Sequence, residues 1–276
     1  MKVWSRSPQR IADEAVLLRA AMRSEEQIVV AGDWHSDPIW LMNVFSRIRD
    51  WPAPITTIVQ LGDLEIRDEK AGKDFLRRVD ERCRGAGIKY VLVVPGNHDN
   101  LDALANRPEW RQRKLTQLSA FVWVVPYGEI LDIGSRRVMF FGGAASVHKN
   151  LVAGKNWWPQ EVPDEAVYKE AAAAGKVDVL FTHEAINGGP EAIQGIIDSS
   201  ASRGIPADRR TASRRSRDLI THVYDAVDPE IAFHGHMHWY AEPARDATRR
   251  IFALSTNQRL GNLGSLSLTD LSFTRI

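Results

Sequence analysis

In the first hundred residues, short apolar runs alternate with longer stretches of helical period. The runs 28–31, 55–61 and 90–94 are rich in β-branched residues, and each stops at Gly, Asn, His or Asp. Such runs are typical of buried strands. Residues 40–49 and 73–84 carry helical patterns between them. This alternation predicts a β-α-β-α-β order with a largely parallel central sheet.

A helix is also expected near the N-terminus. Ser7 is a candidate cap, Pro8 suits the first helical position, and Asp13 and Glu14 place acids in the first turns. These features favour a helix start. The helix should end near Ser24.

The second half of the chain changes character. Residues 121–125, 129–132 and 138–141 are closely spaced strand patterns joined by Pro126-Tyr127-Gly128 and Gly134-Ser135 turns, which predicts hairpins and a second sheet. Further strands are expected at 177–182, 231–233, 251–254 and 265–274, and helices at 164–174 and 218–226.

Without an internal repeat or a long linker, residues 1–276 are best interpreted as one layered domain. The exception is 187–217, where Gly188-Gly189-Pro190, Gly204 and Pro206 accompany a group of arginines. This composition predicts an inserted loop or lid.

Composition narrows the class of protein. Apolar residues make up 44% and charged residues 26% of the chain, which is typical of globular proteins. Thirty-six basic residues nearly cancel 35 acidic ones, so the whole molecule is not a general binder of nucleic acid or anionic membrane. Cys83 is the only cysteine, which excludes an internal disulfide and favours a buried inert thiol. With no signal-peptide pattern and no long apolar run, we expect a soluble cytoplasmic protein that does not associate with membranes.

The candidate chemistry lies where five of the expected strands end. Each end is followed by metal-ligand side chains: Asp33, His35, Asp63, Asn97, His183, His236 and His238. In an extended segment residues two apart share a face, so Asp33 and His35 could point at one ion. One carboxylate, that of Asp63, could bridge two cations. Mixed nitrogen and oxygen ligands without thiolates suit Mn, Fe, Zn or Co rather than a structural zinc site.

These motifs carry a family resemblance. Asp33-x-His35, Gly62-Asp63, Gly96-Asn97-His98-Asp99, His183 and Gly235-His236-x-His238 together resemble the calcineurin-like metallophosphoesterase signature, across residues 33–238. The resemblance implies an α/β fold, a four-layer α/β/β/α metallophosphoesterase sandwich with two mixed β-sheets. It also implies one ion held by Asp33, His35, Asp63 and His238, and a second held by Asp63, Asn97, His183 and His236. The segments Gly142-Gly143-Ala144, Ser146-Val147 and Trp157-Trp158-Pro159 with Glu161 resemble an actinobacterial and phage-type branch.

The expected reaction is hydrolysis of a phosphoester with two divalent transition-metal ions, Mn being favoured. The ions would polarise the phosphate and generate hydroxide from a bridging water. The resemblance implies that His98 is the general acid, and Asp99 could orient it. The favoured substrates are nucleotide, cyclic-nucleotide or nucleic-acid phosphodiesters, because residues 62–67 lack the Asp-Arg-Gly ending of serine/threonine phosphatases, which carry Glu where this chain has Asp99.

Several alternatives stay open. The chain could be a phosphomonoesterase or a protein phosphatase of the same fold, or a non-catalytic scaffold; no obligatory protein partner is indicated. Structural roles are favoured for His148, His222 and His234, and burial for Trp34 and the Trp157-Trp158 pair, which could otherwise stack on a base. Glu184 could support His183, and Arg67 could contact phosphate or pair with an acid. An anionic partner or a solvated loop would each explain Arg203, Arg209, Arg210, Arg214, Arg215 and Arg217.

Overall fold

The computed structural model describes residues 8–243 and 248–276. Its helices are α1 (Pro8–Met22), α2 (Pro38–Arg49), α3 (Lys70–Ala86), α4 (Leu101–Ala105), α5 (Pro108–Arg111), α6 (Glu165–Ala172), α7 (Glu191–Asp198) and α8 (Ala207–Val227), with a 3-10 turn at Pro159–Glu161. Its strands are β1 (Gln27–Ala31), β2 (Thr57–Gln60), β3 (Tyr90–Val93), β4 (Thr116–Gln117), β5 (Val122–Val124), β6 (Glu129–Ile133), β7 (Arg136–Phe141), β8 (Val179–Thr182), β9 (Ile231–His234), β10 (Arg250–Ala253), β11 (Leu263–Ser267) and β12 (Phe273–Arg275).

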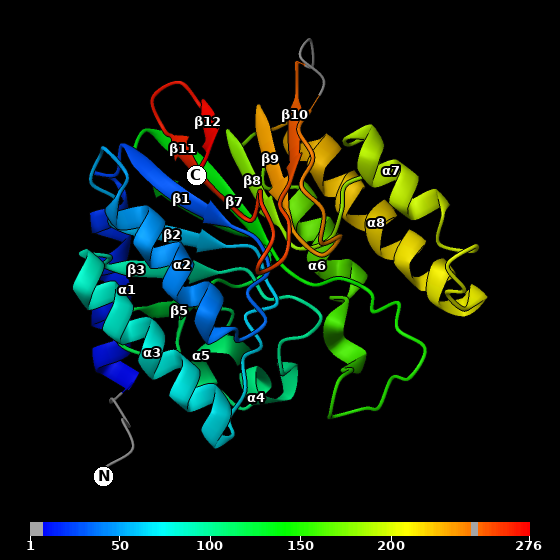
Figure 1. The fold of residues 1–276 in the computed structure, drawn as a ribbon, viewed down its shortest axis with the longest axis horizontal. Helices are drawn as coiled ribbons and strands as arrows, with labels where there is room; N and C mark the ends of the chain where they lie inside the picture. Colours follow the sequence, from blue (N-terminus) through cyan, green and yellow to red (C-terminus); the bar gives the residue numbers. More distant parts are fainter. Residues whose placement is uncertain (1–7, 244–247) are drawn as a thin grey trace.

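The strands form two mixed sheets. The seven-stranded sheet has the order β12-β11-β1-β2-β3-β5-β4, and the five-stranded sheet has the order β10-β9-β8-β7-β6. In the first sheet β1, β2, β3 and β5 run parallel, and in the second β7, β8, β9 and β10 do. Figure 1 shows α2 and α3 in front of the first sheet and α6 and α8 beside the second.

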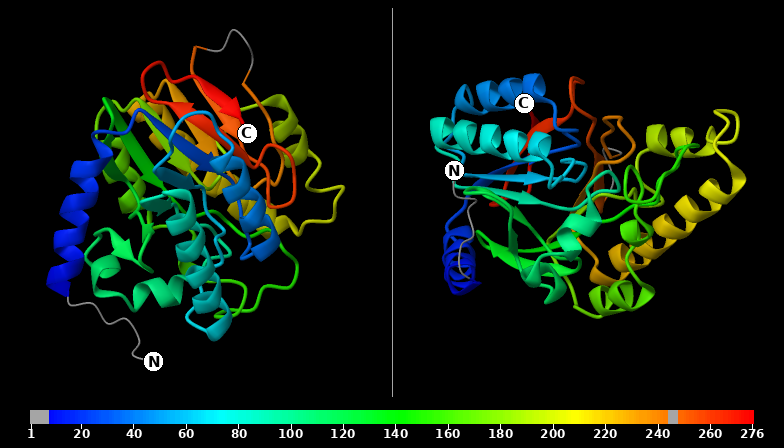
Figure 2. Two further views of the ribbon diagram at one scale, coloured as in Figure 1. Left: turned by 60° about the vertical axis from the view of Figure 1, so that its left-hand side comes forward. Right: turned by 90° about the horizontal axis from the view of Figure 1, so that it is seen from below.

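Alternating side chains along each strand build three apolar layers. Val30 of β1 packs between the sheets with Phe140 and Phe181 of the second sheet. Its neighbour Val29 faces the opposite way and packs against α2 and α3, while Met139 packs against α6 and α8. The period of two places successive residues on opposite faces, so both faces of both sheets are buried. The four-layer α/β/β/α sandwich is therefore confirmed, and Figure 2 shows its layers from two further directions.

Three expectations differ from the structure. The strand predicted at 121–125 belongs to the first sheet, because β5 pairs with β3 and not with the β6–β7 hairpin. The single strand predicted at 265–274 is the antiparallel pair β11 and β12. Asp270 accepts hydrogen bonds from the backbone and hydroxyl of Ser272 between them, which stabilises a turn.

The third difference is the segment 187–217, which is largely helical and not a long loop. It contains α7 and the first half of α8. Pro190 and Pro206 immediately precede these helices, so prolines interpreted as breakers stand at helix starts, where proline is well tolerated. Whether this segment is an insertion, and whether the chain is one domain, remain predictions.

The predicted helix near the N-terminus is present as α1 and ends at Met22, and its candidate cap Ser7 lies outside the described residues. Cys83 is fully buried as expected, and burial raises the pKa of its thiol. None of the helices in the described part of the chain is long and apolar enough to cross a membrane.

Candidate metal centre

The seven predicted ligands gather where the central parallel strands of the two sheets end. β1, β2 and β3 lead into the loops with Asp33, Asp63 and Asn97, and β8 and β9 lead into those with His183 and His236. Because the two sheets face one another, these loops meet at one edge of the sandwich. The carboxyl ends of parallel strands are the usual place for a site in an α/β fold.

One group of ligand atoms is tightly clustered. Asp33, His35, Asp63 and His238 each offer an atom, and these four atoms lie within 4.8 Å of one another. His238 Nε2 lies 3.1 Å from Asp33 Oδ2 and 3.2 Å from His35 Nε2. The structure therefore brings together the four residues assigned to the first ion.

The remaining residues are arranged around His183, which lies near Oδ1 of Asp63. His183 Nε2 lies 3.0 Å from Asn97 Oδ1 and 3.3 Å from Asp63 Oδ1. The His236 ring lies 5.1 Å from the His183 ring, centroid to centroid. The two oxygens of Asp63 thus approach different histidines, His35 at 4.0 Å from Oδ2 and His183 at 3.3 Å from Oδ1, as those of a bridging carboxylate would.

The chemistry of Asp63 fits a pair of cations. Its Oδ2 atom is buried and has no hydrogen-bond partner among the described residues, which is costly for a carboxylate unless a cation compensates it. Burial alone would raise the pKa of Asp63, but the neighbouring imidazoles of His183, His98 and His35 lower it below its ordinary range. The donors, four imidazoles, two carboxylates and an amide, are the kind that divalent transition metals bind.

Neighbouring carboxylates also change the pKa of His35. Burial lowers the pKa of this imidazole, yet the hydrogen bond to Glu65 and the charges of Asp63 and Asp33 outweigh burial and raise the pKa to about 9. His35 Nδ1 lies 3.6 Å from Glu65. A second carboxylate that holds a histidine ligand from behind is a common arrangement at metal sites.

The ligands converge through turns and not through strand alternation. His35, Asp63, His236 and His238 have φ angles of 47°, 54°, 64° and 54°, in the left-handed region that non-glycine residues rarely adopt. The expectation that Asp33 and His35 share a face of an extended segment is therefore wrong in its geometry, although both residues reach the same cluster. Strained backbone of this kind concentrates at functional sites.

Glycines let the loops press against the ligands. A Cβ atom on Gly96 would lie 2.2 Å from Asp63 Oδ1, and one on Gly235 would lie 2.2 Å from Asp33 Oδ1. A Cβ on Gly62, which has a φ of +106°, would lie 2.3 Å from His183 Nδ1. These glycines make room for the candidate ligands themselves.

Substituting Gly96 should therefore damage the site. We expect Gly96→Ala to displace Asp63 and to lower both metal affinity and kcat by at least about tenfold, as loss of ligand support typically does. Gly85→Ala is the matched control, because nothing lies within 4 Å of its Cβ position in α3, and it should raise the free energy of unfolding by roughly 0.5–1 kcal/mol. Metal titration and chemical denaturation of both variants would measure these effects. Equal metal affinity in Gly96→Ala and the wild type would contradict the prediction.

A buried chain of hydrogen bonds orients the Asn97 amide. Asn97 Nδ2 donates to Ser146 Oγ at 3.0 Å, and Ser146 Oγ donates to Glu161 Oε2 at 2.6 Å. The Ser146 backbone N–H and Trp157 Nε1 also donate to Glu161, which is 5% exposed. Since the amide nitrogen donates to Ser146, the amide oxygen faces His183.

Removing that support should weaken the second ion more than the first. We expect Ser146→Ala to lower the affinity of the second metal by about tenfold, within the range typical for partners of metal ligands. Ser119→Ala removes another serine–carboxylate hydrogen bond, to Asp80, away from the site, and should leave metal affinity unchanged. Calorimetric titration with Mn²⁺ would resolve the two binding steps, and an equal loss in both variants would contradict the role of Ser146.

The two proposed catalytic residues have different surroundings. His98 lines a cavity, and its backbone N–H donates to Asp63 Oδ1 at 2.8 Å. Asp99 is buried, and its two oxygens accept hydrogen bonds from the backbone N–H groups of Ile66 and Gly96, each at 2.8 Å. Burial and the charge of Asp63 raise the pKa of Asp99 to about 7. Asp99 therefore joins two site loops, and no hydrogen bond between it and the His98 ring is found in the described residues.

Sequence reasoning missed several contributors. His148 Nε2 lies 3.2 Å from His98 Nε2 and lines the same cavity. Gln60 bonds the backbone of Gly32 and Gly62, and Asn262 bonds that of Asp33. Gln60 did leave a signal, a polar residue that ends a run of buried positions. For His148 the only signal was its position after the Gly142-Gly143 turn, from which it could reach the cavity, and the structural role was favoured instead.

Most of the other residues for which a structural role was favoured lie where such a role would place them. Trp34, Trp158 and His234 are buried, and His222 is exposed on α8. Arg67 pairs with Glu65. Glu184 is buried 3.8 Å from His236 and accepts hydrogen bonds from the Ala145 and Ala185 backbone, so it supports a different histidine from the one expected.

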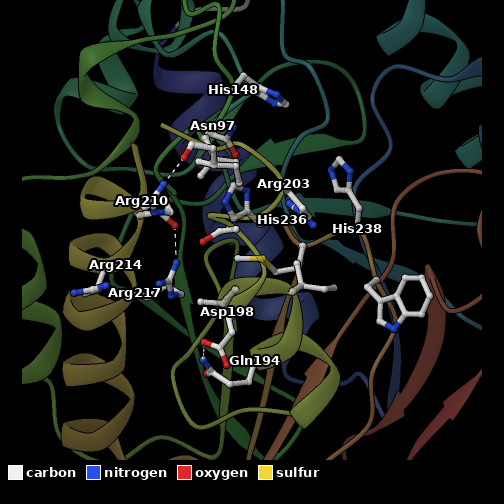
Figure 3. Close-up of a pocket in the computed structure, with 18 of the residues that line it drawn as sticks. Asn97, His148, Gln194, Asp198, Arg203, Arg210, Arg214, Arg217, His236 and His238 are labelled. Atoms are coloured by element: carbon white, nitrogen blue, oxygen red, sulfur yellow. Dashed lines mark hydrogen bonds between the residues drawn. The ribbon is translucent and has the colours of Figure 1, made fainter. Parts of the chain in front are cut away.

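A cavity of about 910 Å³ opens from the metal centre. Its lining includes Asp63, Asn97, His98, His148, His236, His238 and Trp239. Arginines of the α7–α8 segment line it as well. Figure 3 shows Arg210, Arg214 and Arg217 coming from α8, with Asn97, His236 and His238 across the cavity from them. Four of the predicted ligands thus share one cavity with arginines of the α7–α8 segment.

Comparison with known proteins gives a family. Residues 27–240 match the family model described as calcineurin-like phosphoesterase. One solved structure matches with a TM-score of 0.55 at 13% identity, over 90% of this chain and 97% of that chain. GAP50, described as the anchor in the inner membrane complex of Plasmodium, gives 0.50 at 12% identity, over 91% and 88%. A dimetal phosphatase from Danio rerio gives 0.47 at 11% identity, over 88% and 92%. No curated protein matches the chain.

Proposed function

This chain belongs to the calcineurin-like phosphoesterase family and is therefore a metal-dependent hydrolase of phosphoric esters, and from this premise we propose that it is a two-metal phosphodiesterase. Its substrates are nucleotide, cyclic-nucleotide or nucleic-acid phosphodiesters. The observation that carries the proposal is Asp63, a buried carboxylate with one unpartnered oxygen, whose two oxygens approach histidines of the two groups of ligand atoms.

The two groups define which residues hold the ions. The first ion is held by Asp33, His35, Asp63 and His238, and the second by Asp63, Asn97, His183 and His236. Mn²⁺ is the favoured ion, since imidazole and carboxylate donors bind it together, and Fe, Zn and Co suit the same donors. Two such ions supply Lewis acidity to the phosphate and activate water near neutral pH.

His98 is positioned to protonate the leaving group. Its backbone N–H is held by Asp63 Oδ1, and its imidazole faces His148 within the cavity. An imidazole beside the metal centre can donate a proton to a departing alkoxide. Asp99 acts on His98 through the backbone, because it holds the loop on which His98 stands.

The cavity favours a diester of nucleotide type. A diester needs space for organic groups on both sides of phosphorus, and a cavity of about 910 Å³ that runs from the ligands to Trp239 and α8 provides it. Trp239 is 51% exposed and lines this cavity beside the ligand His238. An exposed indole is a suitable platform on which a base can stack.

The test is a comparison of two chromogenic esters. Metal-free protein loaded with Mn²⁺ should bind two ions and hydrolyse bis-p-nitrophenyl phosphate at least about tenfold more efficiently than p-nitrophenyl phosphate, a difference worth about 1.4 kcal/mol. The opposite preference would favour a phosphomonoesterase or a protein phosphatase. Failure to bind any transition metal would favour a non-catalytic scaffold.

A further inference from the structure

Three exposed or half-exposed arginines of the α7–α8 segment line the cavity and form no ion pair with a described residue. Arg203 precedes α8, and Arg210 and Arg214 lie one turn apart on the same face of that helix. Among residues 8–243 and 248–276, no acid forms an ion pair with any of the three, and Arg210 donates only to the carbonyl of Ile205. We call these three residues the arginine wall.

The other arginines of the segment are neutralised or engaged elsewhere. Arg215 pairs with Glu165, and Arg209 pairs with Asp208 and lies over the Trp157 ring. Arg217 lines the cavity but is only 7% exposed, and donates to Ser213 and Asn187. The unpaired charge of the segment is therefore concentrated on the side that faces the metal centre.

Besides Asp63, two acids line the cavity, and neither pairs with the arginine wall. Asp198 accepts from the Gln194 amide, and Asp218 accepts from the Asn187 amide. Neither forms an ion pair with an arginine of the wall among the described residues. A guanidinium has five donors in a fork that matches phosphate oxygens, so a phosphate group is a suitable ligand for the wall.

We propose that the arginine wall binds a second phosphate group of the substrate, so that the enzyme acts on small nucleotide phosphodiesters that carry a further phosphate. This inference rests on the proposed function, since it takes the metal centre as the place where the ester is cut. A small ligand is favoured over a polymer because the chain has a net charge of only +1 and the unpaired arginines gather in one cavity.

Two substrates that differ by one phosphate provide the test. Thymidine 5′-(p-nitrophenyl phosphate) and its 3′-phosphorylated counterpart both release p-nitrophenol when water adds to phosphorus and the aryl P–O bond breaks. The second should have a kcat/KM at least about tenfold higher, as expected for charge-assisted hydrogen bonds to the extra phosphate. A ratio near one would overturn the inference and leave the phosphodiesterase standing.

Two arginine variants test whether the arginine wall causes the preference for the 3′-phosphorylated substrate. In Arg214→Gln, whose side chain is exposed, the preference for the 3′-phosphorylated substrate should fall by about tenfold. Arg215→Gln is the matched control, because Arg215 is the next residue of the same helix but pairs with Glu165, and it should keep the wild-type preference. Equal preferences in both variants and the wild type would also overturn the inference.

A binding experiment separates this inference from the proposed function. Calorimetry on metal-free protein should show thymidine 3′,5′-bisphosphate binding at least about tenfold more tightly than thymidine 5′-phosphate, with the difference lost in Arg214→Gln. If neither ester is hydrolysed with any metal, the proposed function fails, and this binding result alone decides the inference. If the kcat/KM for cleavage of single-stranded DNA is far higher than that for the phosphorylated nucleotide, the substrate is a polymer and the inference of a small ligand is overturned.

Discussion

Asp63→Asn is expected to remove at least one of the two metal ions and to lower kcat/KM by roughly 1000-fold or more, because the reaction depends on both ions. The neutral amide offers one oxygen where the carboxylate offers two, and it removes the charge that holds the cations together. Elemental analysis after Mn²⁺ loading, together with the kcat/KM for bis-p-nitrophenyl phosphate, would measure both effects.

A matched control lies in the same loop. Asp68 is exposed, and its one ion pair with a described residue is a long one with Arg107 at 3.5 Å, so Asp68→Asn should retain wild-type metal binding and turnover. Surface pairs of this kind contribute about 0–1 kcal/mol to stability. If Asp63→Asn binds two ions with wild-type affinity, Asp63 does not bridge them, and the assignment of two ions that share one ligand is wrong.

The parts of this fold that sequence could predict are those with a strong local signal. Buried strands such as β1 and β3 appear as uninterrupted apolar runs, and each is followed by a candidate ligand, so the sheet edge at which the candidate ligands gather could be predicted. The hairpin of β6 and β7 also left its signal in glycine-containing turns. Local sequence patterns of this kind predict the structure correctly because tertiary packing favours the same strands and turns.

Helix α7 and the first half of α8 were missed for a physical reason, whereas the second half of α8 was predicted as a helix over 218–226. Their prolines stand at helix starts, and arginines at 210, 214 and 217 occupy one face of α8 where apolar residues would have given a helical pattern. That face lines a polar cavity, so the sequence lacks the apolar stripe on which periodicity depends. Because this face of α8 lines the cavity, its sequence lacks the apolar pattern from which a helix is predicted.

Side-chain contacts between distant loops could not be predicted at all. The bond from Asn97 to Ser146, and the approach of His148 to His98, depend on how two sheets pack. The direction of the Asp99 side chain was likewise not predictable, because its carboxylate accepts hydrogen bonds from the backbone of Ile66 and Gly96. Neighbours along a loop often point in different directions, so sequence adjacency is weak support for a shared role.

His98→Asn should separate protonation from metal binding. His98 holds no place in either ligand group, so both ions should remain, while kcat for an ester with an alkyl leaving group should fall by about 10²- to 10⁴-fold. With p-nitrophenol as leaving group the loss should be much smaller, because that anion departs without a proton. Elemental analysis and kcat for both esters would measure the difference.

Two histidine variants complete this test. His148→Asn removes the imidazole 3.2 Å from His98, and since His148 only contacts the proton donor, its effect on the alkyl ester should be smaller than that of His98→Asn. His222→Asn, on the exposed face of α8, should have no effect on either ester. If His98→Asn loses both esters equally, the imidazole acts on the metal centre or on phosphate binding, and His148, which shares the cavity and faces the same space, becomes the candidate proton donor.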